Sequence, residues 1–136
     1  MSPKPRFLLD TNICIYLMRQ QPPQVAQRLA TCVVGEVVIS AITAAELEYG
    51  VAASGEDRER NREALSRFLL EIPVAPFDGA AARVYGAVRL ANPERRRDAL
   101  DKLIASHALA LNLTLVTNNP KDFIIYKDLS IENWVG

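Results

Sequence analysis

The chain alternates short apolar runs with longer amphipathic segments, and this alternation limits its fold more than any other feature. Residues 7–9, 37–40 and 113–117 are apolar and rich in branched side chains, which is typical of buried strands. Strands separated by helical segments indicate βα units and a mainly parallel sheet. The sequence therefore predicts an α/β fold with helices on both faces of the sheet.

The other expected elements follow from periodicity and from helix-breaking residues. Helices are expected at residues 12–20, 24–30, 43–53, 57–72, 79–91 and 98–111. Residues 73–78 form a short edge strand at best, because their two prolines remove ladder donors, and residues 129–134 offer a last short strand. No repeat or linker divides the chain, so we expect a single domain over residues 1–136.

Composition excludes several classes of protein. With 49% hydrophobic and 24% charged residues, the chain is not expected to be disordered. It has no apolar run of membrane-spanning length and no secretory signal, so we expect a cytoplasmic protein that does not enter the membrane. Cys14 and Cys32 are too few for a disulfide framework or a cysteine-based zinc site. Because the net charge is zero, a nucleic acid would have to bind at a local basic patch.

Carboxylates follow each of the three strongest predicted strands. Asp10 comes directly after the first strand, and Glu46 and Asp122 come a few residues after the second and third. Because ligands bind beyond the carboxyl ends of parallel strands, we expect these groups at one edge of the sheet, with Asp101 of the last long helix close by. Carboxylates that share a cleft repel one another unless a cation neutralises them. Ligation by oxygen alone suggests Mg²⁺ or Mn²⁺, which activate water to attack a phosphodiester.

Several of these residues also have a purely structural explanation. Asp10 fits a helix cap, and Thr43 with Glu46 fits a capping box at the start of a helix. Asp98 or Asp101 fits an acid in the first turn of a helix. Capping does not explain why the strongest strands all bring acids to one edge, nor why Asp101 lies beside an apolar stripe.

Asp122 follows Asn-Asn-Pro, so it too has a structural explanation, as a turn residue. Other chemistries fit the sequence less well. His107, the single histidine, faces the apolar stripe of its helix, so we expect a role in the core or behind the site. The chain contains no GxSxG elbow, P-loop or GxGxxG motif. A phosphotransfer domain with Asp10 as acceptor would start with D-x-D, but the third position is Asn12.

Four segments together resemble, in order and spacing, the PIN-domain ribonucleases. They are FLLDTN (7–12), SAITAAELEYG (40–50), DKLIASHAL (101–109) and LTLVTNNPKDF (113–123). The likeness is closest to the VapC toxins of bacterial VapBC toxin–antitoxin pairs and covers about residues 6–134. It implies a three-layer α/β/α PIN-like domain and Mg²⁺- or Mn²⁺-dependent endonucleolytic cleavage of RNA, often tRNA. It also implies a homodimer, a VapB-type antitoxin that blocks the cleft, and contact with DNA only through that antitoxin.

The resemblance assigns roles to individual residues. Asp10 and Asp101 would be the principal metal ligands, and Glu46 would complete an acidic triad of catalytic residues. Asn119 and Asp122 lie where the fourth acidic position of the family is expected, and Asp122 is included among the catalytic residues. The groups expected to orient these carboxylates are Thr11, Asn12, Thr117 and Asn119.

Three points stay open at this stage. Asp98 lies close enough in sequence to assist Asp101, but the resemblance does not settle whether it does. Arg95, Arg96 and Arg97 would bind RNA phosphates, unless they form only a solvated connector. The Ala- and Gly-rich helices around Tyr49-Gly50 and Tyr85-Gly86 would support a dimer, unless their small residues pack within the monomer. A catalytically silent PIN-like module that binds RNA or protein is the alternative function, and the intact acids favour the enzyme.

Overall fold

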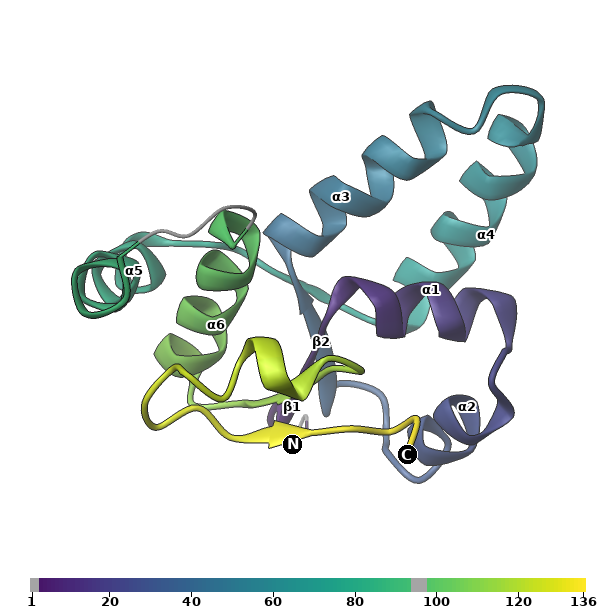
Figure 1. Cartoon of the computed structure of the whole chain (residues 1–136). Helices are drawn as coiled ribbons and strands as arrows, with labels where there is room; N and C mark the ends of the chain where they lie inside the picture. The colour runs from purple at the N-terminus through teal and green to yellow at the C-terminus, as the bar shows by residue number, and fades with distance from the viewer. Residues whose placement is uncertain (1–2, 94–97) are drawn as a thin grey trace.

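The computed structural model describes residues 3–93 and 98–136, and the strands in these residues form one parallel sheet (Figure 1). The strands are β1 (Phe7–Leu9), β2 (Val37–Ser40), β3 (Val74–Ala75), β4 (Thr114–Val116) and β5 (Ile131–Glu132). The helices are α1 (Thr11–Arg19), α2 (Pro23–Leu29), α3 (Ala41–Ala52), α4 (Arg58–Glu71), α5 (Gly79–Ala91) and α6 (Ala99–Leu111). Single 3₁₀ turns lie at Gly55–Asp57 and Pro120–Asp122. None of the helices in the described residues is long and apolar enough to cross a bilayer.

The strand order is β3-β2-β1-β4-β5, so β1 lies at the centre of the sheet between β2 and β4. Each described pair of neighbouring strands is parallel, and their carboxyl ends therefore lie at one edge. The predicted edge strand before α5 is confirmed as β3, which pairs only with β2 in the described residues. This order brings the ends of β1 and β4 side by side, although the two strands are far apart in the chain.

Alternate residues of β1 enter two separate cores, one on each face of the sheet. Leu8 packs with Ile104 of α6 and Leu115 of β4. Phe7 and Leu9 pack on the opposite face, in a cluster with residues of α1, α2, α3 and α4. Helices α5 and α6 therefore cover one face and the other helices lie on the second side (Figure 1). This arrangement confirms the predicted α/β/α architecture with a mainly parallel sheet.

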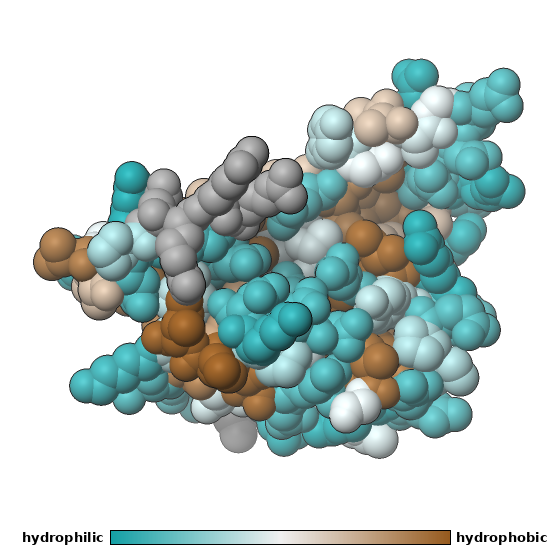
Figure 2. Space-filling model, in the orientation of Figure 1, coloured by the Kyte–Doolittle hydropathy of each residue, from teal (hydrophilic) through white to brown (hydrophobic). Residues whose placement is uncertain are grey.

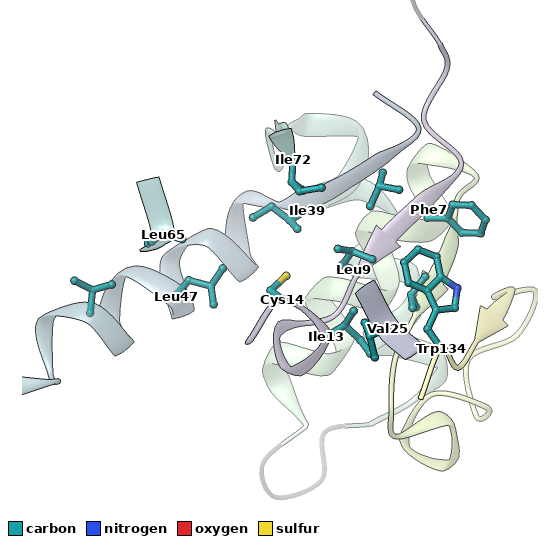
Figure 3. Close-up of a cluster of buried hydrophobic side chains, with 13 residues drawn as sticks. Phe7, Leu9, Ile13, Cys14, Val25, Ile39, Leu47, Leu65, Ile72 and Trp134 are labelled. Atoms are coloured by element: carbon teal, nitrogen blue, oxygen red, sulfur yellow. The ribbon is translucent and has the colours of Figure 1, made fainter. Parts of the chain in front are cut away.

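The core on the α1 side fixes the helix that follows β1. Ile13 and Cys14 of α1 are fully buried, and they face Val25 of α2 and Leu47 of α3 in the cluster with Leu9 (Figure 3). Burial at roughly 25 cal/mol per Å² of apolar surface makes such a cluster the main stabilising contribution. Because α1 is anchored directly after β1, the residue between the two elements has little freedom to move.

The start of α3 differs from the sequence prediction. The helix begins at Ala41, and the side chain of Ser40 caps it by accepting a hydrogen bond of 3.0 Å from the Ile42 N–H. The predicted capping box of Thr43 and Glu46 is therefore wrong. Thr43 lies within the first turn of the helix with its side chain buried, and the Glu46 carboxylate accepts a hydrogen bond from Thr11. The strand runs into the helix without a loop, which leaves Glu46 free to face the end of the sheet.

Candidate active site

Asp10 occupies the centre of the candidate site, because it ends the central strand and caps α1. Its Oδ1 accepts a hydrogen bond of 2.8 Å from the Thr11 N–H, and its Oδ2 accepts one of 2.9 Å from the Thr117 hydroxyl. The residue is only 8% exposed. Burial raises the pKa of Asp10 above its ordinary value, although both hydrogen bonds lower it. The two bonds fix the carboxylate in one orientation and leave each oxygen a further lone pair for a ligand.

Thr117 connects the end of β4 to the neighbouring end of β1. Its side chain is fully buried, and its hydroxyl oxygen accepts a hydrogen bond of 3.0 Å from the Asn119 N–H while its hydrogen goes to Asp10. Asn119 therefore acts on this network through its main chain. The predicted orienting residues Thr117 and Asn119 thus lie directly behind the Asp10 carboxylate.

Thr11 orients a different carboxylate. Its hydroxyl donates a hydrogen bond of 2.8 Å to Oε1 of Glu46, which joins the first turn of α1 to the second turn of α3. The pair lies 35 positions apart in the chain. Asn12 also lines the cleft, but its side chain forms no hydrogen bond with a carboxylate among the described residues.

The predicted acids meet in one cleft of about 270 Å³ at the carboxyl edge of the sheet. Its lining residues are Asp10, Thr11, Asn12, Glu46, Leu100, Asp101, Ile104, Asn119, Asp122 and Phe123. Asp122 comes from the 3₁₀ turn after β4 and is exposed at the surface. The structure therefore brings the four predicted carboxylates together from four separate segments of the chain.

Crowding among these acids is clearest at Asp101, in the first turn of α6. Burial and then the charges of Asp10, Asp122, Asp98 and Glu46 raise the pKa of Asp101 to about 6. Like charges disfavour ionisation of a neighbouring carboxyl, and a cation placed among them reverses the effect. Asp101 is therefore the residue that would respond most strongly to an ion in the cleft.

The donor set of the cleft fits a hard divalent cation. The described residues that line it carry charge only on carboxylates, and neither cysteine is one of them. Among the described residues, no three His, Cys, Asp or Glu side chains are grouped tightly enough to ligate one ion directly. Mg²⁺ does not require such a group, because it retains several waters and binds through one or two carboxylates and the phosphates of its substrate. The residues present therefore fit Mg²⁺ or Mn²⁺ with few direct protein ligands.

A buried ion pair next to Asp101 was not predicted from the sequence. Lys102 is completely buried, and its Nζ lies 3.0 Å from Oδ1 of Asp98, which is mostly buried as well. Asp98 precedes α6 without capping it through its side chain. Its position four residues before Lys102 was the available signal, because such pairs meet on one side of a helix. Asp98 bonds to Lys102 and does not line the cleft, although its charge still affects Asp101.

The single histidine lies outside the cleft. His107 is buried, its Nδ1 lies 2.7 Å from the Ser40 hydroxyl, and its ring meets Phe77 edge to face. Burial lowers the pKa of His107 below its ordinary value. The histidine therefore connects α6 to the end of β2, where Ser40 caps α3. The predicted RNA-binding residues Arg95, Arg96 and Arg97 lie outside the described residues.

Comparison with known proteins places this geometry in a family. The family model for the PIN domain matches residues 7–128. Ribonuclease VapC2 of Rickettsia felis is 38% identical over 134 residues, which cover 94% of this chain and 97% of the relative. The tRNA(fMet)-specific endonuclease VapC of Shigella flexneri is 37% identical over 131 residues, with 95% and 98% covered.

Solved structures agree with these relatives. The structure of VapBC2 from Rickettsia felis bound to a promoter DNA fragment matches with a TM-score of 0.83 and 37% identity, over 94% of this chain and 98% of that chain. DNA-bound VapBC from Salmonella typhimurium matches with a TM-score of 0.85 and 32% identity, over 96% and 98%. With its acidic cleft at the carboxyl edge of a parallel sheet, the chain belongs to the PIN-domain family and, within it, to the VapC ribonucleases.

Proposed function

We propose that the protein is a Mg²⁺- or Mn²⁺-dependent endoribonuclease that acts as the toxin of a type II toxin–antitoxin pair. The observation that supports it most is the convergence of Asp10, Glu46, Asp101 and Asp122 on one cleft, with the pKa of Asp101 raised to about 6 by burial and by its acidic neighbours. A silent module would not need to keep mutually repelling acids together at a cost in stability. Membership of the VapC ribonucleases supports the same activity.

In this proposal, residues of the cleft would bind the metal ion, and their neighbours orient the carboxylates. Asp10 and Asp101 would hold the ion, and the Thr11 N–H and the Thr117 hydroxyl keep the Asp10 carboxylate in position. Glu46, oriented by the Thr11 hydroxyl, and Asp122 at the mouth of the cleft accept hydrogen bonds from water. When bound, the ion would polarise the phosphodiester and lower the pKa of the attacking water. Because an ion would require an ionised Asp101, its uptake would release the proton that this carboxyl holds below about pH 6.

The proposed substrate is RNA, with tRNA as the first to test, because one relative is named as specific for tRNA(fMet). The proposed partner is a VapB-type antitoxin, because several similar structures are VapBC complexes. A groove of about 570 Å³ between α1, α2 and α4, lined by apolar residues such as Leu17 and Phe68 and by polar ones such as Arg67, is a suitable surface for a protein segment. Co-expression with the antitoxin should suppress cleavage.

The test is cleavage of total RNA and of purified tRNA by the isolated protein, with Mg²⁺ or with EDTA. We expect discrete products only with the metal, and a loss of about 100-fold or more in Asp101→Asn. Asp128→Asn is the matched control, because Asp128 lies outside the cleft and its φ of 68° is tolerated by Asn. Metal-independent cleavage, or equal activity of the two variants, would contradict the proposal.

A further inference from the structure

We propose that a pocket beside the acidic cleft binds one unpaired nucleobase of the RNA and so selects the position of cleavage, an inference that rests on the ribonuclease function proposed above. The pocket lies between α1, α3 and α4 and has a volume of about 240 Å³. It shares two lining residues, Thr11 and Glu46, with the cleft. A nucleotide whose phosphate lies at the carboxylates therefore has this pocket within reach of its base or of a neighbouring base.

The walls of the pocket are apolar. They include Ile15 and Met18 of α1, Leu47 and Val51 of α3, and Leu65 of α4. In the space-filling view, apolar side chains are visible between the α3–α4 hairpin and α1 (Figure 2). Enzymes that extract a base from its stack commonly enclose the ring between apolar or aromatic side chains. Drug-sized ligands occupy pockets of roughly 300–1,000 Å³, so this smaller volume suits a single ring system better than an extended ligand.

Two polar side chains of the pocket have no protein partner within residues 3–93 and 98–136. Asn61 of α4 is half-buried and Arg19 ends α1, and neither forms a hydrogen bond or ion pair with any residue that the structure describes. A side-chain amide carries two donors and an acceptor, which match the edge of a base. A guanidinium suits a phosphate oxygen. The pocket thus combines an apolar enclosure, a group for the base edge and a cation for the adjacent backbone.

A side chain from a protein partner is the alternative occupant. An apolar side chain would suit the walls, but it would leave Asn61 and Arg19 without partners at the interface, which costs binding free energy. The larger groove between α1, α2 and α4 offers a protein segment more apolar surface. Single-stranded RNA, in contrast, is recognised mainly through bases that leave their stack.

Gly50 of α3 allows the pocket to be filled without disturbing the fold. It lines the pocket, and a Cβ at this position would meet no atom within 4 Å. Gly50→Ala should therefore leave the pocket open, and Gly50→Leu should occupy it. Ala52→Leu is the matched control, because Ala52 is exposed on the same helix and does not line the pocket. Asn61→Ala keeps the space and removes the group that contacts the base edge.

The experiment measures cleavage of a short single-stranded RNA of randomised sequence, followed by kcat/KM on individual sequences. We expect the parent to prefer one base at a fixed position beside the cleaved bond. Gly50→Leu should lower kcat/KM for the preferred RNA by about tenfold, equivalent to about 1.4 kcal/mol. It should leave unchanged the rate on the same RNA with an abasic site at that position. Asn61→Ala should flatten the base preference, and Ala52→Leu should behave as the parent does.

Other outcomes would overturn the inference. A parent that cleaves RNA without any base preference, or a Gly50→Leu variant with unchanged preference and rate, would show that no base enters the pocket. If that variant retained its cleavage pattern and lost affinity for the antitoxin, the pocket would belong to the protein interface. A parent that neither binds nor cleaves RNA would remove the proposed ribonuclease function, and the inference with it.

Discussion

Asp10 caps α1 and faces the acidic cleft at the same time, and its replacement by Asn separates these two roles. Asn caps a helix as well as Asp does, so the cap at Thr11 should persist. In EDTA we expect Asp10→Asn to raise the free energy of unfolding by on the order of 1 kcal/mol, because the variant buries no charge beside other acids. With millimolar Mg²⁺ the parent should gain stability by ligand linkage and the variant little. Thermal melts of both proteins under both conditions provide the measurement.

Asp10→Ala is the control for this experiment, because it removes the cap together with the charge and should lose about 1 kcal/mol through the cap alone. If parent and Asp10→Asn showed the same Mg²⁺-induced shift and the same activity, Asp10 would be a cap and no metal ligand.

The raised pKa of Asp101 predicts how stability depends on pH when no metal is bound. Its folded pKa of about 6 lies above the ordinary value of 3.8, so the folded state binds more protons than the unfolded state between these values. The free energy of unfolding should therefore fall as pH rises from about 4 to about 6. Asp101→Asn should lose most of this fall, because Asn does not titrate. Thermal melts of both proteins in EDTA from about pH 4 to about pH 7 measure this fall. If stability changed with pH in parallel in the parent and in Asp101→Asn, the raised pKa of Asp101 would be contradicted.

At the scale of elements, the Asp98–Lys102 pair predicts an asymmetric response to mutation. Lys102 is completely buried, whereas the Asp98 side chain is 17% exposed. Asp98→Ala leaves a buried ammonium without its counter-charge and should lower the free energy of unfolding by about 3 kcal/mol. Lys102→Met should cost about 1 kcal/mol, because the remaining carboxylate can reach water. Urea denaturation of both variants provides the measurement.

The exposed pair of Asp57 and Arg60 offers a control on another helix. Asp57→Ala should change stability by less than about 1 kcal/mol, as expected for surface ion pairs. Equal losses in Asp98→Ala and Lys102→Met would show that the asymmetry in burial has no energetic effect.

The elements were largely predictable from sequence, because apolar runs and helical periodicity are local signals. Residues 37–40 and 79–91 form β2 and α5 with the expected limits. The start of α3 was not predicted, since Thr43 and Glu46 match a local capping pattern and only the fold shows that Ser40 caps the helix. Local patterns compete with contacts that are distant in sequence, and here the distant contact of Glu46 prevails.

The acids of the site were also predictable, because parallel strands end at one edge of a sheet. The hydrogen-bond partners of these acids were less predictable. The bond between Thr11 and Glu46 joins residues 35 positions apart, and no periodicity encodes it. The burial of Lys102 contradicts the general expectation that lysine stays at the surface, and it is a property of the packed fold that no local pattern encodes.

At the scale of the whole molecule, two glycines bear on self-association. A Cβ at Gly50 or Gly86 would meet no atom within 4 Å, so neither glycine packs tightly inside the monomer, although Ala81 of α5 is fully buried. Leu90 lies one turn after Gly86 on α5 and is 85% exposed. We expect this face of α5 to contact a second copy of the chain, because small residues allow the close approach of helices.

Gly86→Arg tests the dimer. The monomer should tolerate the substitution, since the position is open, whereas a helix from a second copy would clash with the longer side chain. Sedimentation at micromolar concentration should show a dimer for the parent and a monomer for the variant, with unchanged thermal stability in dilute solution. A parent that sediments as a monomer without antitoxin would contradict the prediction.

The central position of β1 has a consequence for synthesis on the ribosome. Asp10 is translated before Thr117, which orients it and follows 107 positions later. A nascent chain that ends before β4 has no second neighbour for β1, and it lacks the turn that brings Asp122 to the cleft. Contacts between such distant segments form late, because a long loop must close first. A nuclease harmful to its own cell would therefore be translated as an inert chain, and an antitoxin already present could meet it before the active site is complete.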